Sequence, residues 1–162
     1  MEAISFEAIE PADPVVRTAL TRYLTELLTR GAASALDAEE IEDVEDYRPP
    51  TGVFLVGRGE DDKVVGCGAV RALGPGLGEI KRMWIDPRWR GQGNGARLIA
   101  ALEDSARQLG YGILRLDTSE ELVEAVHLYQ RSGYRAIDRY NENPDATLFF
   151  EKQVDPASTP DS

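Results

Sequence analysis

Apolar and polar residues alternate over residues 3–9, a pattern typical of a short β-strand. Asp13 and Pro14 follow and predict a helix start, because aspartate caps a first turn and proline suits its first position. Apolar residues then recur at spacings of three and four, which predicts an amphipathic helix that ends at Gly31. These apolar positions are Val16, Leu20, Tyr23, Leu24, Leu27 and Leu28.

From residue 51 the pattern changes to short apolar runs that are typical of strands. The runs at residues 53–56 and 64–70 are separated by a polar turn at residues 59–62, which predicts a β-hairpin. A glycine-rich connector at residues 74–78 leads to a third strand at residues 79–85. We therefore expect antiparallel strands in the middle of the chain.

The second half of the chain alternates helices and strands. A glycine-rich loop precedes a helix with apolar residues at Leu98, Ile99, Leu102 and Leu109, which Gly110 ends. Later elements are a strand at 113–116, a helix at 120–132, and strands at 134–139 and 146–152. The order β-α-α-β-β-β-α-β-α-β-β predicts one α/β domain, with helices layered on a mixed, mainly antiparallel sheet of roughly six to seven strands and about four helices. This domain spans residues 1–152, and we expect a disordered tail at residues 153–162.

The composition is that of a globular domain. The 162 residues are 42% hydrophobic and 29% charged, which is ordinary for one domain. With 29 acidic and 18 basic residues the net charge is −11, which argues against sequence-independent binding of nucleic acids. Residues 36–46 are strongly acidic; they form a solvated face or a cation site, and by charge alone they favour a cationic acceptor.

The chain has one cysteine, Cys67, and one histidine, His127, so it offers no intramolecular disulfide and no cysteine-based zinc site. Cys67 lies in a predicted strand, where we expect a buried, unreactive thiol. No apolar run reaches the roughly 18 residues of a membrane span, and the first residues lack the layout of a signal peptide. We therefore expect a cytoplasmic protein that binds neither a membrane nor a metal.

The loop at residues 90–96 carries three glycines between a strand and a helix. Such a loop lets the backbone approach a ligand, and the N–H groups and dipole of the helix N-terminus favour a phosphate. A simple turn is the alternative. The loop also fits the dinucleotide pattern at Gly91, Gly93 and Ala96, with Asp117 downstream, but a polar spacer separates it from the strand. A Walker A loop is excluded because the chain has no Gly-Lys pair.

Two motifs resemble those of the GNAT superfamily of acyl-CoA N-acyltransferases. The first is the pattern Arg/Gln-x-x-Gly-x-Gly/Ala, with Arg90, Gly93 and Gly95, after a strand that ends in Ile-x-Pro. The second, Ala-x-x-x-Tyr-x-x-x-Gly-Phe/Tyr, is filled by Ala125, Tyr129, Gly133 and Tyr134. The element order over residues 3–152 also matches this fold. Many members carry an asparagine where this chain has Leu122, and Thr118 or Ser119 are candidates to replace its contact.

The resemblance implies acetyl-CoA as cosubstrate, with no metal. Members of the family part the strand before the loop from its neighbour, so that its backbone pairs with the pantetheine arm. The residues implied for that contact are Met83, Trp84 and Ile85. The loop would hold the pyrophosphate, through Arg90, Gly91, Gln92, Gly93, Asn94, Gly95 and Ala96.

The chemistry needs a base for the amine, a donor for the carbonyl oxygen and an acid for the departing thiolate. A backbone N–H near Ile85 is the expected carbonyl partner. The resemblance implies Tyr129 as the acid and Glu79 as the base. The alternatives are that Tyr129 is a tyrosine of the hydrophobic core and that Glu79 is a charge on the protein surface. Strand alternation predicts one face for Glu79, Lys81, Met83 and Ile85, and the other for Arg82 and Trp84.

We therefore expect an N-acetyltransferase that moves the acetyl group directly to a primary amine of a small molecule or a peptide. No convincing nucleophile is present for a covalent enzyme intermediate. The alternative is a non-catalytic acyl-CoA-binding or sensing module on the same fold. The sequence leaves the acceptor and the oligomeric state open, and a homodimer is among the states that it allows.

Overall fold

The computed structural model describes residues 4–31 and 44–155 of the chain. One seven-stranded sheet has the strand order β1-β2-β3-β4-β5-β7-β6. Among the described strands, β4 and β5 are the only parallel neighbours, and the other pairs are antiparallel. The strands are β1 (Ser5–Ala8), β2 (Val53–Arg58), β3 (Val64–Gly74), β4 (Leu77–Ile85), β5 (Ile113–Thr118), β6 (Arg135–Ala136) and β7 (Leu148–Gln153).

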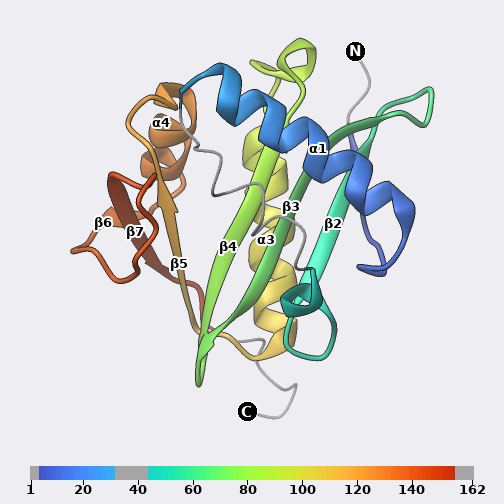
Figure 1. Ribbon diagram of the computed structural model, residues 1–162. Helices are drawn as coiled ribbons and strands as arrows, with labels where there is room; N and C mark the ends of the chain where they lie inside the picture. The colour runs from blue at the N-terminus through green and yellow to red at the C-terminus, as the bar shows by residue number, and fades with distance from the viewer. Residues whose placement is uncertain (1–3, 32–43, 156–162) are drawn as a thin grey trace.

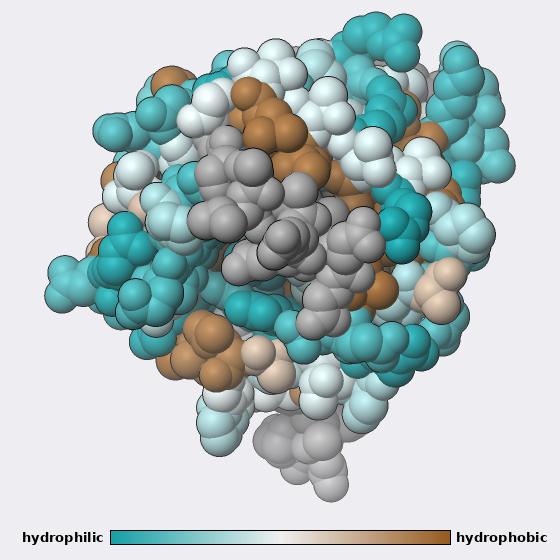
Figure 2. Space-filling view, viewed as in Figure 1, coloured by the Kyte–Doolittle hydropathy of each residue, from teal (hydrophilic) through white to brown (hydrophobic). Residues whose placement is uncertain are grey.

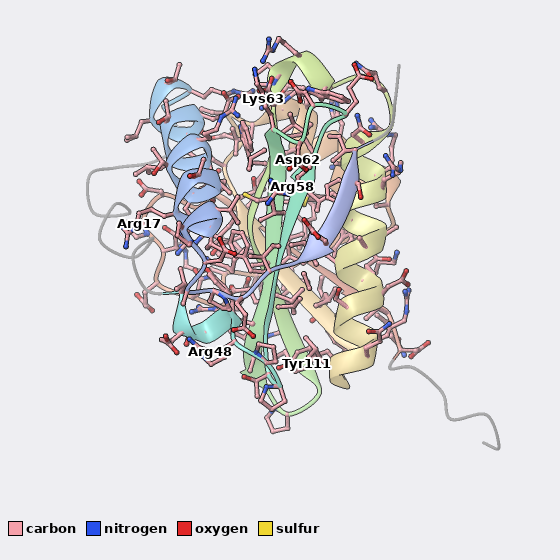
Figure 3. All side chains as sticks on the ribbon, turned by 90° about the vertical axis from the view of Figure 1, so that its right-hand side faces the viewer. Arg17, Arg48, Arg58, Asp62, Lys63 and Tyr111 are labelled. Atoms are coloured by element: carbon pink, nitrogen blue, oxygen red, sulfur yellow. The ribbon has the colours of Figure 1, made fainter. Side chains whose placement is uncertain are left out.

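Helices cover both faces of the sheet. They are α1 (Pro14–Thr29), α3 (Asn94–Leu109) and α4 (Val123–Arg131), with short 3-10 turns at Glu45–Tyr47 and Pro87–Trp89. Figure 1 shows α1 in front of the sheet and α3 behind it, and the edge-on view in Figure 3 shows the sheet between them. The described part of the chain thus forms the α/β fold that the sequence predicts.

Local signals explain where the helices begin and end. The Asp13 side chain accepts a hydrogen bond from the Val15 N–H, and Pro14 occupies the first turn of α1. Gly110 closes α3 with a φ of +95°, a conformation that glycine adopts without strain. Both boundaries follow the prediction.

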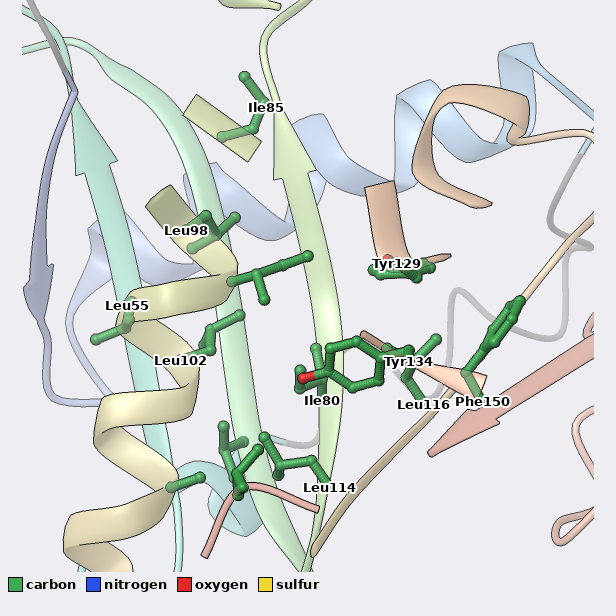
Figure 4. Packing of buried hydrophobic residues seen from close by; sticks show 14 of the residues in the cluster. Leu55, Ile80, Ile85, Leu98, Leu102, Leu114, Leu116, Tyr129, Tyr134 and Phe150 are labelled. Atoms are coloured by element: carbon green, nitrogen blue, oxygen red, sulfur yellow. The ribbon is translucent and has the colours of Figure 1, made fainter. Parts of the chain in front are cut away.

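The sheet separates two hydrophobic clusters. Under α1 lie residues such as Val16, Leu20, Phe54, Cys67 and Trp84. On the other face, α3 and α4 pack through Leu98, Leu102 and Tyr129 against Ile80, Leu114, Leu116 and Phe150, as Figure 4 shows. Figure 2, drawn from the α1 side, shows hydrophilic residues around the rim of this face and hydrophobic patches nearer its middle. No helix among the described residues is long and apolar enough to cross a membrane.

The C-terminal part differs from the prediction in its boundaries. The helix expected from Glu120 begins at Val123, and the strand expected over residues 134–139 is reduced to Arg135–Ala136. Gln153, expected in the tail, belongs to β7. Residues 156–162 and most of the acidic run lie outside the described residues.

A β-bulge in β4 changes which way its side chains point. Cys67 pairs with Trp84 but Ala69 pairs with Lys81, so β4 has an extra residue, and Arg82 has a φ of +60°. The cross-strand partners place Lys81 and Trp84 on the α1 face. Glu79 shares that face, whereas Met83 and Ile85 pack on the opposite one. The predicted common face for Glu79, Lys81, Met83 and Ile85 was therefore wrong, because alternation holds only in a regular strand.

Candidate active site

The strands β4 and β5 part in the middle of the sheet. They pair only from Leu77–Ile113 to Glu79–Arg115, and beyond this point they diverge, as the V between them in Figure 1 shows. None of the described strands pairs with this edge of β4 after Glu79. Backbone N–H and C=O groups there are available to a ligand that lies along the strand. The predicted parting of this strand from its neighbour is confirmed.

A cavity of about 570 Å³, here called the large cavity, opens between α1, α4, the end of β4 and the start of α3. Met83, Trp84 and Ile85 line it, as do the loop residues Arg90, Gly91, Gly93, Gly95 and Ala96. The other lining residues are Tyr23, Glu26, Leu27, Arg30, Leu122, Glu124, Ala125, His127, Leu128, Tyr129 and Arg131. A phosphate-bearing ligand fits this lining, since it meets the N-terminus of α3 and several arginines.

The glycines of the loop serve two purposes. Gly91 and Gly93 have φ values of +74° and +83°, and a Cβ on either would enter open space. Gly95 instead permits close packing, because a Cβ there would lie 2.7 Å from Leu128 Cδ2 on α4. The first two glycines therefore keep the backbone exposed to the cavity, and the third brings α3 and α4 together.

Two predicted loop residues do not line the large cavity. The Asn94 side chain is buried and donates to the Trp89 carbonyl oxygen at 2.9 Å. Gln92 donates through its side chain to the Arg88 carbonyl oxygen at 3.3 Å. These side chains hold the loop in shape, so any contact of these two residues with a ligand would come from their backbone.

Arg90 lies at the mouth of the loop with its guanidinium already engaged. Its Nε donates to the Ile85 carbonyl oxygen at 2.9 Å, and an Nη pairs with Glu26 at 2.8 Å. Glu26 also lies 3.8 Å from Arg30, which pairs with Glu124 at 2.7 Å. This chain of charges joins α1, the loop and α4 across the large cavity.

A smaller pocket of about 90 Å³, here called the small pocket, lies on the α1 side of the splayed strands. Its polar lining consists of Tyr23, Lys81, Arg82, Asp117, Thr118, Ser119, Asn143, Asp145 and Tyr129. The two cavities share Tyr23, Leu27, Met83, Leu122, Ala125 and Tyr129 in their linings. They therefore adjoin, and Met83 and Tyr129 lie between them.

Tyr129 is held rigidly at this junction. Its ring packs against Tyr134 and Phe150, with centroid separations of 6.2 and 6.1 Å, and Figure 4 shows it beside β4. Its hydroxyl lies 3.9 Å from Met83 Sδ. Burial raises the pKa of the Tyr129 hydroxyl, and the charge of Asp117 raises it further. The hydroxyl therefore stays protonated at neutral pH.

Glu79 lines neither cavity. Its side chain is 0% exposed, and its carboxylate accepts hydrogen bonds from Arg71 at 2.8 Å and Tyr140 at 2.6 Å. Asn141 lies at 3.5 Å from the same carboxylate and donates to Asp117 at 2.5 Å. The alternative interpretation of Glu79 as a surface charge is therefore wrong. Glu79 lies outside the small pocket and is linked to the pocket residue Asp117 through Asn141.

Asp117 lines the small pocket, as Asp145 does, and the sequence analysis assigned neither carboxylate to the reaction. Asp117 lies 3.9 Å from Lys81 in addition to its contact with Asn141. Leu114 and Leu116 are buried on the α3 side, so Asp117 faces α1, as Glu79 does. The alternation along β5 carries this signal, but only the pairing of β4 with β5 brings the two carboxylates together.

The remaining predicted positions are also placed. Leu122 precedes α4 without a side-chain cap and lines both cavities, while Thr118 and Ser119 line the small pocket. Cys67 is buried, and burial raises the pKa of its thiol to about 12. No cluster of metal-ligating side chains is found in the part of the chain that the structure describes.

Known proteins resemble the chain along most of its length. A profile of the Acetyltransferase (GNAT) family matches residues 18–134. An uncharacterized N-acetyltransferase of Schizosaccharomyces pombe is 36% identical over 116 residues, which cover 71% of this chain and 71% of that protein. The IAA acetyltransferase of Azospirillum brasilense is 35% identical over 141 residues, or 83% of this chain and 86% of the relative.

A solved structure gives the same result at the level of the fold. A Klebsiella pneumoniae protein named as an acyl-CoA N-acyltransferase superposes with a TM-score of 0.74 at 34% sequence identity. The match covers 93% of this chain and 97% of that one.

Proposed function

The chain belongs to the GNAT family of acetyltransferases and is an acyltransferase, and we propose that it transfers the acetyl group of acetyl-CoA to a primary amine of a small molecule or peptide. The observation that carries this proposal is the junction at Tyr129. The large cavity, which the glycine-rich loop lines, meets the small polar pocket there, where β4 and β5 part. A donor and an acceptor bound on the two sides would meet at this point.

On the large-cavity side, the chain's backbone supplies most of the binding. The free edge of β4 at Met83, Trp84 and Ile85 would pair with an amide-containing arm, and the loop N–H groups would hold a pyrophosphate. Arg90 flanks the loop, and its ion pair with Glu26 orients the guanidinium beside the loop. Acetyl-CoA, when bound, supplies the activated acetyl group, and a β4 N–H near Ile85 would stabilise the carbonyl oxygen as it becomes negative.

On the small-pocket side, Asp117 would accept a proton from the acceptor's ammonium group; this assignment is supported by its position in the pocket lining and by the effect of its charge on the Tyr129 hydroxyl. Glu79, the base that the resemblance implies, does not line the pocket, and Asn141 links its carboxylate to that of Asp117. The amine then attacks the acetyl carbonyl, its bond to carbon forms, and the bond from carbon to sulfur breaks. Tyr129 gives its hydroxyl proton to the departing thiolate, and the resulting tyrosinate takes up the second proton that the nitrogen loses as the amide forms.

An acceptor panel tests the proposal. Purified protein is mixed with acetyl-CoA and with amines that differ in charge and size, and the release of free CoA thiol is followed. We expect amine-dependent release with at least one class of acceptor. Acetyl-CoA should raise the melting temperature and NADH should not. A protein that binds acetyl-CoA but acetylates no amine would be the binding module instead.

A further inference from the structure

Arg82 is a buried cation that projects from the bulge of β4. Its side chain lies on the α1 face, and the residue is 9% exposed where it lines the small pocket. Its Nε donates to the Tyr47 hydroxyl at 3.0 Å, and Tyr23 lines the same pocket. The Tyr47 hydroxyl is neutral, so it positions Arg82 without neutralising its charge.

Neighbouring cations, which are only partly buried, have acidic partners. Arg71 pairs with Glu79 at 2.8 Å, and Lys81, the residue before Arg82, lies 3.9 Å from Asp117. Within residues 4–31 and 44–155, no carboxylate forms an ion pair with Arg82. A buried guanidinium is costly unless an anion compensates it, and its planar N–H groups match a carboxylate or a phosphonate.

The small pocket also offers a place for the other end of such a ligand. Asp117 and Asp145 line it beside Arg82, and the pocket adjoins the junction at Tyr129. A molecule with one anionic end and one ammonium end would match this distribution of charge. An acceptor with two cationic ends would instead place a positive charge against Arg82.

We propose that the acceptor is an amine that also carries an anionic group, a carboxylate or a phosphonate, and that Arg82 binds this group. The inference rests on the proposed function and narrows its substrate class. This proposal differs from the cationic acceptor that the acidic residues 36–46 suggest. The residues that line the pocket would contact the acceptor directly, so they are a better guide to its charge than the net charge of the chain.

The test compares matched acceptors on the wild-type protein. The set contains an amino acid, an aminoalkylphosphonate, the neutral amide of the amino acid and the diamine of the same length. The value of kcat/KM is calculated on the concentration of free amine, so that differences in ammonium pKa do not enter. We expect at least a tenfold preference for one or both anionic acceptors, and the two anionic arms identify which group is recognised.

Variants then assign the preference to Arg82. Arg82→Gln should bring the anionic and neutral acceptors to nearly equal kcat/KM, and Arg82→Lys should keep part of the preference. Arg115→Gln is the matched control, because Arg115 lies on the neighbouring strand, pairs with Glu151 at 2.8 Å and does not line the pocket. It should leave the preference unchanged. The melting-temperature shift with acetyl-CoA shows whether each variant is folded.

The outcomes separate the two proposals. Equal use of anionic and neutral amines by the wild-type protein would overturn this inference alone, even if Arg82→Gln does not fold. An undiminished preference in Arg82→Gln, or an equal loss in Arg115→Gln, would also overturn the role of Arg82. If no amine is acetylated, the proposed function fails, and this inference fails with it.

Discussion

Replacing Tyr129 by phenylalanine removes one hydroxyl from the junction between the two cavities. The hydroxyl has one described contact, the weak one to Met83 Sδ at 3.9 Å, while the ring packs against Tyr134 and Phe150. Phenylalanine preserves this packing, so the loss of stability should stay below about 1 kcal/mol. General acid catalysis contributes more than that, and we expect kcat to fall roughly 10- to 1000-fold, or about 1.4 to 4 kcal/mol of barrier.

The assay measures kcat by release of CoA thiol and the affinity for acetyl-CoA by titration. The fall should appear in kcat with little change in affinity. Since burial and Asp117 raise the pKa of Tyr129 above its ordinary value near 10, the wild-type hydroxyl stays protonated as the pH rises. The wild-type kcat should therefore show no loss from this group below about pH 10.

A second tyrosine provides the control. The Tyr134 hydroxyl donates to Glu103 at 2.9 Å, and Tyr134 lines neither cavity. Tyr134→Phe should lower stability by roughly 1–3 kcal/mol, since it removes a buried hydrogen bond to a charged group, and it should leave kcat unchanged. The reasoning is refuted if Tyr129→Phe keeps full kcat, or if Tyr134→Phe loses as much.

Three further predictions follow from the same geometry. Gly93→Val should weaken acetyl-CoA binding at least tenfold, or about 1.4 kcal/mol, because the valine side chain would enter the large cavity. Calorimetric titration measures the affinity, and unchanged affinity in a folded variant would contradict pyrophosphate binding by the loop. Asp117→Asn should lower kcat/KM most at neutral pH, and the rate should recover as free amine becomes abundant near pH 10. Glu79→Gln should instead mainly lower the melting temperature, because it removes buried hydrogen bonds. Rate profiles against pH and thermal melts distinguish the two variants, and a pH-dependent loss of rate in Glu79→Gln alone would make Glu79 the base. Cys67 should resist thiol reagents until urea unfolds the protein, because burial raises the pKa of its thiol to about 12. The rate of thiol labelling with and without urea measures this, and rapid labelling of the native protein would contradict it.

Much of the fold was predictable because its signals are local. The cap at Asp13, the glycine at Gly110 and the apolar spacing of α3 each depend on neighbours along the chain, and each is confirmed. The glycine loop predicted a phosphate site for the same reason. The short β6 shows the limit, since apolar residues after Gly133 looked like a longer strand, yet only Arg135 and Ala136 pair with β7.

The small pocket was less predictable because it depends on contacts between distant segments. The bulge at Arg82 breaks the alternation that placed the β4 side chains, and no local residue preference marks it. The sequence left Glu79 as a candidate base or a surface charge at the strand end, but its carboxylate is buried and bonded to Arg71 and Tyr140. Asp117 lines the pocket because β5 parts from β4 just before it, and the sequence does not mark where two strands part.

The most direct test of the account follows an isotopically labelled acetyl group from acetyl-CoA. The protein is incubated with labelled acetyl-CoA, with and without an acceptor amine, and the amine, the protein and free CoA are analysed by mass spectrometry. The account predicts label on the amine in equal amount to the CoA released, none bound covalently to the protein, and no appreciable release without amine. Label that stays on the protein, or release of CoA that does not depend on the amine, would contradict direct transfer at the junction of the two cavities.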